Sequence, residues 1–151
     1  MAWTSEMFDR ITDKIVAILS TDADLNDGLT TEVQVHKGVR TQGPEPAAIS
    51  VFRAAVENYG YWMGEDGTNI VAVWGLVIVC RHLGDPEALE KLLATILANT
   101  ARVMFKHKGE AGYWDSAVLQ GSDAVSFRDD LNQTWEMETV LVRVSFESSD
   151  D

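Results

Sequence analysis

The sequence predicts an α+β fold: a mixed, mainly antiparallel sheet of about four main strands, two amphipathic helices packed on one face, and a short β-hairpin. Residues 70–80 are apolar at odd and even positions alike and carry no charge, so both faces of a strand formed by them would be apolar. This is typical of a strand in the middle of a sheet. Residues 5–20 and 86–104 instead repeat apolar side chains every three or four positions, as amphipathic helices do. The remaining apolar segments alternate with polar residues, which favours half-buried strands.

The first predicted helix, residues 5–20, leads into a polar connection and a strand. Its apolar face consists of Phe8, Ile11, Ile15, Ile18 and Leu19. Residues 21–28 are polar and end in a turn signal. Residues 32–40 place their valines on one parity, so we expect a half-buried strand there.

Residues 47–57 fit two interpretations. Ile49 and Val51 alternate as in a strand. A helical face could instead gather Phe52, Ala55, Val56 and Tyr59. We favour a strand, because Pro46 precedes a short apolar–polar alternation. Residues 59–67, rich in glycine, then form a hairpin-like connection into the central strand.

The second helix has clear start and stop signals. Asp85 is the expected N-cap and Pro86 the first helical residue, where its missing N–H costs no hydrogen bond. Lys106, Lys108 and Gly109 supply positive charge and a glycine at the other end, which suits the helix dipole and a C-cap.

The C-terminal part of the chain is predicted to be extended. Residues 117–119 and 124–127 predict a short inserted hairpin, and residues 134–147 alternate as a closing strand. Residues 148–151 are expected only as a flexible acidic tail. A length of 151 residues suits one core, so residues 1–151 are predicted to form a single domain.

Composition excludes several classes of function. The formal net charge of −12 argues against specific binding of nucleic acid. Cys80 is the one cysteine, so neither a disulfide nor a cysteine zinc site is expected within one chain. The N-terminus lacks the pattern of a signal peptide, and the longest apolar run is too short to cross a bilayer. We therefore expect a protein made in the cytoplasm that has no membrane partner.

No combination of residues indicates catalysis or a cofactor. The histidines are His36, His82 and His107. None has the partners of a nucleophilic triad or a metal site, so structural or surface roles are expected. The acidic cluster of Asp22, Asp24 and Asp27 departs from a calcium loop, because its glycine comes one position late and a strand follows. The prediction is that the chain is no enzyme and holds no cofactor or metal.

Aromatic side chains concentrate in one glycine-rich segment. Its members are Tyr59, Tyr61, Trp62 and Met63, and Tyr113 and Trp114 follow the second helix. Interface cores are enriched in aromatic residues and methionine, so the first four residues are the candidate oligomer or partner interface. The alternative is that these rings fold back over the domain's own sheet.

The order of these elements resembles the tail terminator proteins of long-tailed bacteriophages, the lambda-like tail terminator or minor tail protein family. The likeness is carried by residues 8–19 with 22–25, 46–51, 70–80, 89–104 and 135–146, nearly the whole chain. It rests on order, length and pattern, and related neck and tail-completion subunits share this layout.

The resemblance implies a structural virion protein, located in the tail or neck, without catalytic residues. Its copies would form a homohexameric ring that caps the tail tube, ends tube polymerisation and joins the tail to the head connector. The implied partners are further copies of the chain, the tail tube protein and head connector or neck proteins. Genome DNA would only pass through an acidic lumen, without specific binding.

Three alternatives remain open at the level of sequence. The chain could be a neighbouring neck, tail-completion or head-closure protein. It could be a small cytosolic adaptor that binds a partner through its aromatic segment. It could also be a small enzyme with a carboxylate pair among Asp123, Asp129 and Asp130.

Overall fold

A computed structural model describes residues 5–38, 46–58, 67–82, 86–128 and 134–149. The helices are α1 (Ser5–Thr21), the short 3-10 helix η1 (Ala23–Asn26) and α2 (Pro86–Lys106). The strands are β1 (Gln34–Lys37), β2 (Ala47–Asn58), β3 (Gly67–His82), β4 (Ser116–Arg128) and β5 (Thr134–Ser149).

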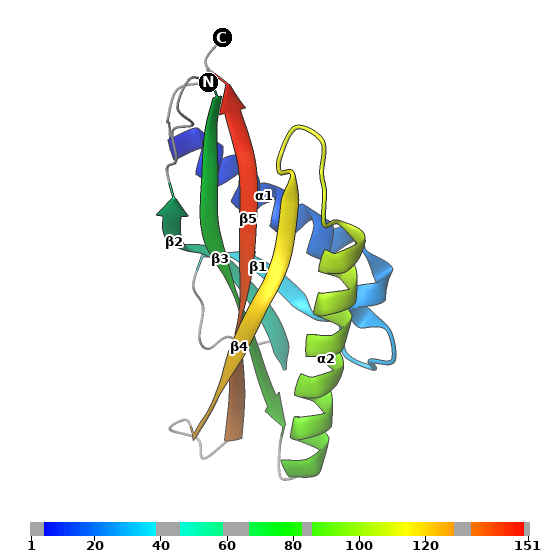
Figure 1. Cartoon of the computed structure of the whole chain (residues 1–151). Coiled ribbons are helices and arrows are strands. Elements are labelled where there is room, and N and C mark those ends of the chain that lie inside the picture. Colours follow the sequence, from blue (N-terminus) through cyan, green and yellow to red (C-terminus); the bar gives the residue numbers. More distant parts are fainter. Residues whose placement is uncertain (1–4, 39–45, 59–66, 83–85, 129–133, 150–151) are drawn as a thin grey trace.

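The five strands form one sheet in the order β1-β2-β3-β5-β4. β1 runs parallel to β2, and every other neighbouring pair is antiparallel. α1 packs against β1 and β2, and α2 packs against β3, β5 and β4, so the helices share one face of the sheet (Figure 1). The predicted α+β class, with two helices on one face of a mixed sheet, is confirmed.

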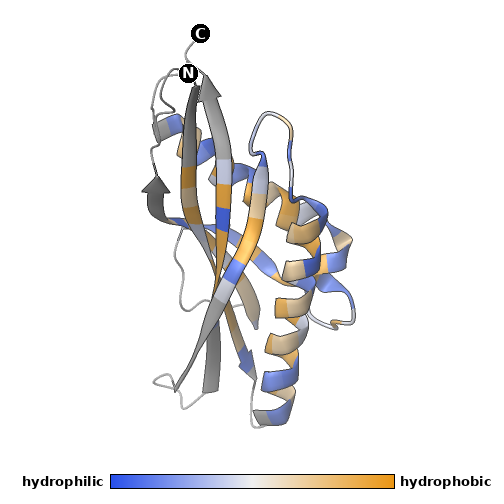
Figure 2. Cartoon of the chain, viewed as in Figure 1, coloured by the Kyte–Doolittle hydropathy of each residue, from blue (hydrophilic) through white to orange (hydrophobic). Residues whose placement is uncertain are grey.

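β3 is the central strand and is buried on both faces. Every residue from 71 to 80 is buried, in agreement with its uncharged sequence. The helix-facing side chains are Ala72, Trp74, Leu76, Ile78 and Cys80, each 0% exposed. In Figure 2 the ribbons of β3 and α2 carry orange stretches, the colour of hydrophobic residues.

The opposite face of β3 is covered by a ring from its neighbour. Phe52 of β2 lies directly across from Gly75 and packs against Val77 and Val79. A Cβ atom at Gly75 would lie 2.4 Å from the Phe52 ring, so glycine leaves the space that this ring occupies. An aromatic side chain over a strand glycine restores the apolar contact that the glycine lacks.

Trp74 joins the sheet to α1 through both its ring and its polar atom. Its Nε1–H donates to Thr12 Oγ1 at 2.8 Å, and that hydroxyl donates to the Phe8 carbonyl at 3.0 Å. The Phe8 ring lies 6.3 Å from the Trp74 ring, and the Arg53 guanidinium lies 4.7 Å from the Phe8 ring. Buried indoles require such an acceptor, so Thr12 fixes how α1 lies on the sheet.

The structure corrects one predicted element. The expected hairpin over residues 117–119 and 124–127 is wrong, because β4 is one continuous strand paired with β5. The turn signal around Gly121 produces a β-bulge instead, with φ of 152° at that glycine. A bulge absorbs one extra residue without reversing the chain, and the β5 partners continue on both sides of it.

Most predicted boundaries agree with the structure to within a few residues. β2 confirms the strand interpretation of residues 47–57, and α2 begins at Pro86 as predicted. β1 is shorter than the predicted strand over residues 32–40, and β5 continues to Ser149. The expected N-cap Asp85 lies outside the described residues. Among the helices that the structure describes, none combines the length and apolar character needed to span a membrane.

Removing the acceptor for the buried indole should destabilise the fold. Thr12→Val keeps the side-chain shape but leaves Trp74 Nε1–H unpaired, and we expect a loss of about 1–3 kcal/mol in unfolding free energy. Urea unfolding followed by tryptophan fluorescence measures it. Thr21→Val is the matched control, because the exposed Thr21 hydroxyl makes the same kind of bond, to the Ala17 carbonyl at 2.7 Å. Equal losses in both variants would contradict this role for Thr12.

Candidate functional site

The predicted interface residues Tyr59, Tyr61, Trp62 and Met63 lie outside the described residues. Their role stays a prediction. The two residues that border the segment are placed: β2 ends at Asn58 and β3 begins at Gly67.

The histidines and carboxylates considered for catalysis lie on separate elements where the structure describes them. His36 lies on β1, whereas His107 directly follows α2 and contacts Asp22 and Glu110. Asp123 lies on β4, whereas Asp129 and Asp130 are outside the described residues. Within the part of the chain that the structure describes, no group of three or more His, Cys, Asp or Glu residues could hold a metal ion.

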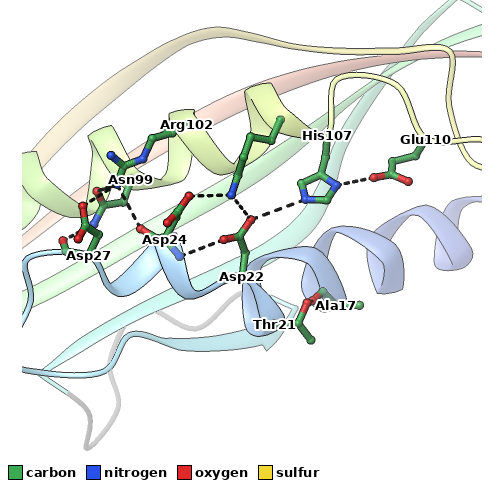
Figure 3. Close-up of polar contacts among 10 residues, drawn as sticks. Ala17, Thr21, Asp22, Asp24, Asp27, Asn99, Arg102, His107 and Glu110 are labelled. Carbon is green, nitrogen blue, oxygen red and sulfur yellow. Dashed lines mark hydrogen bonds and ion pairs between the residues drawn. The ribbon is translucent and has the colours of Figure 1, made fainter.

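The acidic cluster after α1 is neutralised by the end of α2. Asp22 caps η1 by accepting from the Asp24 backbone N–H at 3.0 Å. Lys106 Nζ lies 2.7 Å from Asp22 Oδ2 and 2.7 Å from Asp24 Oδ2 (Figure 3). The hydrogen bond from Lys106 and then the one from the Asp24 N–H hold the pKa of Asp22 below its usual range. The same two carboxylates, Asp22 first, raise the pKa of Lys106.

Two further contacts complete this polar network. Arg102 Nη2 lies 3.1 Å from Asp27 Oδ2 and donates to Asn99 Oδ1 at 2.9 Å (Figure 3). The buried Asn99 donates its amide to the carbonyls of Leu25 and Asp27, at 3.0 and 2.9 Å. These contacts explain the three aspartates as partners of α2 that fix the connection after α1.

His107 belongs to the same network. Its Nε2 lies 3.7 Å from Asp22 Oδ2, and its Nδ1 contacts the Glu110 carboxylate. The imidazole therefore bridges two carboxylates, which is a structural role of the kind that the sequence predicts for the histidines.

Of the two aromatic residues that follow the second helix, Tyr113 is partly exposed and Trp114 is buried. Trp114 is 3% exposed and belongs to the core, with Nε1 donating to the His107 carbonyl at 2.9 Å. Tyr113 is half-buried, and its ring receives the charged groups of Arg10 at 5.1 Å and Lys14 at 4.8 Å. Both rings attach the segment after α2 to the domain itself.

An apolar groove lies between α2 and the edge strand β4. Its volume is about 530 Å³. Pockets that bind small ligands have volumes of roughly 300–1,000 Å³. One wall of the groove consists of residues from α2 and the segment after it: Ala101, Arg102, Met104, Phe105 and Lys108. The other wall consists of Ala117, Val118 and Leu119 of β4. Ala117 N–H donates to the Lys108 carbonyl at 2.8 Å, which ties the two walls together at one end.

Sequence reasoning missed this groove. Phe105 follows the core residues Val103 and Met104, so a helical pattern alone assigns it to the end of an apolar run. The position of Phe105 around the helix axis could have revealed it. Phe105 lies on the same face of α2 as the exposed Ala94 and Ala98, away from the residues that face the core.

Comparison with known proteins identifies the fold and no family. No family model matches the sequence, and no curated protein matches it. The structure is similar to a chain in the solved virion of a native gene transfer agent (GTA) particle, with a TM-score of 0.53 and 16% sequence identity. The match covers 87% of this chain and 91% of that chain. At this identity the likeness shows a common fold.

The ion pairs of Lys106 give stability a pH dependence. Because the pKa of Asp22 is lower in the folded state, its contribution is present above the unfolded value of about 3.9 and is lost as the pH falls through the folded value. Lys106→Met should therefore lower the thermal unfolding temperature at about pH 7 and have little effect near pH 2. Calorimetry at both pH values measures this.

Lys91→Met is the control for that experiment. Lys91 is exposed on the same helix and makes no ion pair with any residue that the structure describes. Its replacement should leave the thermal unfolding temperature unchanged at both pH values. If Lys106→Met destabilised the protein equally at both pH values, the carboxylate partners would not be the source of the effect.

Proposed function

We propose that this chain is a structural virion protein, and more specifically a tail terminator that forms a homohexameric ring on the end of a phage tail tube. The observation that carries the proposal is the fold likeness to a chain in a gene transfer agent virion, which extends over 87% of this chain and 91% of the other. The likeness in element order to tail terminators, argued from sequence, supports the finer assignment.

The sheet edges support assembly into a ring. The two edge strands differ: β1 has 4 residues and β4 has 13. An interface between unlike surfaces is heterologous, and repeated rotation by the same angle closes such copies into a ring or extends them as a filament. A terminator requires the closed outcome, because a ring caps a tube and offers no further site for its growth.

The charge supports a conduit that does not bind its contents. A net charge of −12 repels phosphate, so DNA would slide through an acidic lumen with little adhesion. In this proposal the partners are other copies of the chain, the tail tube protein on one face and head connector or neck proteins on the other. The protein would act in the tail or neck of the virion, without catalysis.

The test is assembly, first alone and then with tubes. Sedimentation of the purified protein over a wide concentration range should give a discrete ring or a concentration-dependent oligomer, with rings visible by electron microscopy. Added to polymerising tail tube protein of the same particle, it should shorten the tubes and appear at one end. An unrelated acidic protein of similar size is the control. A protein that stays monomeric at high concentration, with tubes present, would refute the proposal.

The same assay separates a terminator from a neighbouring neck or head-closure protein. A terminator binds tube ends in the absence of the head connector and stops elongation. A head-closure protein binds the connector first and leaves tube length unchanged. Retention of tube growth together with connector binding would move the assignment to the neck.

A further inference from the structure

β4 is the last strand of the sheet, and exposed apolar side chains flank it on both faces. It has 13 residues and lies next to β5 at the end of the strand order. Phe105 of α2 is 70% exposed and lines the groove on the helix side of β4. Val118 is 55% exposed and alternates with Ala117 and Leu119, which contribute to the core, so it lies on the sheet face opposite the helices. A long edge strand with apolar neighbours is prone to pair with another chain.

The connection between α2 and β4 covers the start of this edge. It consists of residues 107–115, which we call the edge strap (Figure 1). The Lys108 carbonyl accepts the Ala117 N–H at 2.8 Å. Alternate N–H groups of an edge strand point away from the sheet, and an added strand would bond to these groups. The edge strap therefore occupies an outward donor at the beginning of β4.

Contacts within the edge strap fold it into a compact turn. Trp114, which is 3% exposed, donates its Nε1–H to the His107 carbonyl at 2.9 Å. The Glu110 N–H donates to the Trp114 carbonyl at 3.1 Å, and the Trp114 N–H donates to the Glu110 carbonyl at 3.0 Å. Gly112 has a φ of 84°, a conformation that glycine adopts without strain. These contacts fix the shape of the segment that presents the Lys108 carbonyl to β4.

Charged side chains of α1 fasten the edge strap to the rest of the domain. The Tyr113 ring receives Lys14 Nζ at 4.8 Å and the Arg10 guanidinium at 5.1 Å. Arg10 Nη2 also donates to the Gly112 carbonyl at 3.5 Å, and Lys14 Nζ lies 4.0 Å from Glu110 Oε2. Single contacts of this kind contribute little at a protein surface. Together they form a connection that substitutions can remove without changing a core residue.

We propose that the edge strap is an autoinhibitory contact that keeps β4 from pairing with β4 of a second copy. Two identical edges that pair antiparallel are related by a two-fold axis, so they form a closed dimer. Phe105 and Val118, which would favour this pairing, flank residues 117–119, where the edge strap lies. The bulge at Gly121 ends the regular ladder of that stretch. The inference does not depend on the proposed ring.

Two independent changes to the full chain loosen the edge strap. Tyr113→Ser removes the ring that receives both cations, whereas Arg10→Ala combined with Lys14→Ala removes the cations and keeps the ring. Either change should accelerate hydrogen exchange of the Ala117 amide by about tenfold or more, because its bond to the edge strap opens more often. Sedimentation should then show a dimer. Lys91→Ala is the control, because Lys91 is exposed on α2 and outside the edge strap, and it should change neither measurement.

A further substitution identifies the surface that pairs. Val118→Lys, added to either loosened variant, places like charges on both edges and should abolish the dimer. Exchange of the Ala117 amide should stay fast, because the exposed Val118 side chain lies on the face opposite the helices. A dimer that survives Val118→Lys would show that another surface pairs and would overturn the inference.

The remaining outcomes also decide the matter. Fast exchange of the Ala117 amide without a dimer would overturn the autoinhibitory role, as would unchanged exchange in both loosened variants. If the unchanged protein forms rings, dimers of the loosened variants should appear at the expense of rings. If the unchanged protein is a monomer, which would refute the proposed ring, dimers should replace monomers and the inference would stand.

Discussion

The fold depends on burying both faces of β3 with helices on only one of them. On the helix side, α1 and α2 cover the side chains that alternate from Ala72 to Cys80. On the other side, the Phe52 ring lies over Gly75 and shields Val77 and Val79. A sheet solvated on one face normally alternates apolar and polar residues, so an apolar strand there requires cover from its neighbours. Gly75 is the position at which that cover becomes possible.

The basic residues of α2 and of the segment directly after it are used in two ways. On one side of the helix, Lys106 and Arg102 neutralise Asp22, Asp24 and Asp27 and fix the connection after α1. Towards β4, Lys108 borders the groove. Exposed ion pairs contribute little each, but a network joined to the buried Asn99 amide positions a whole connection. These contacts hold the connection after α1 against α2.

Local patterns predicted the class of fold and most elements, because each depends on neighbouring residues. The uncharged run in β3 and the Pro86 start of α2 are of this kind. The errors concern partners distant in sequence. The sequence around Gly121 predicts a turn, but β5 pairs with β4 on both sides of this glycine. The burial of Trp114 depends on the segment after α2, where its indole N–H donates to the His107 carbonyl. The groove was not predictable, because its walls come from α2 and β4 and meet only in the folded chain.

An isologous contact between two copies fits the structure less well than a heterologous one. Pairing β4 of one copy with β4 of another would close a dimer and end assembly at that point. The outer edge of β4 is unsuited to this, because the Ala117 N–H is engaged and the ladder is interrupted at Gly121. An interface between two different surfaces of the chain leaves each copy with one donor surface and one acceptor surface. That is the minimum a closed ring requires, and the angle between the two surfaces then sets the number of copies.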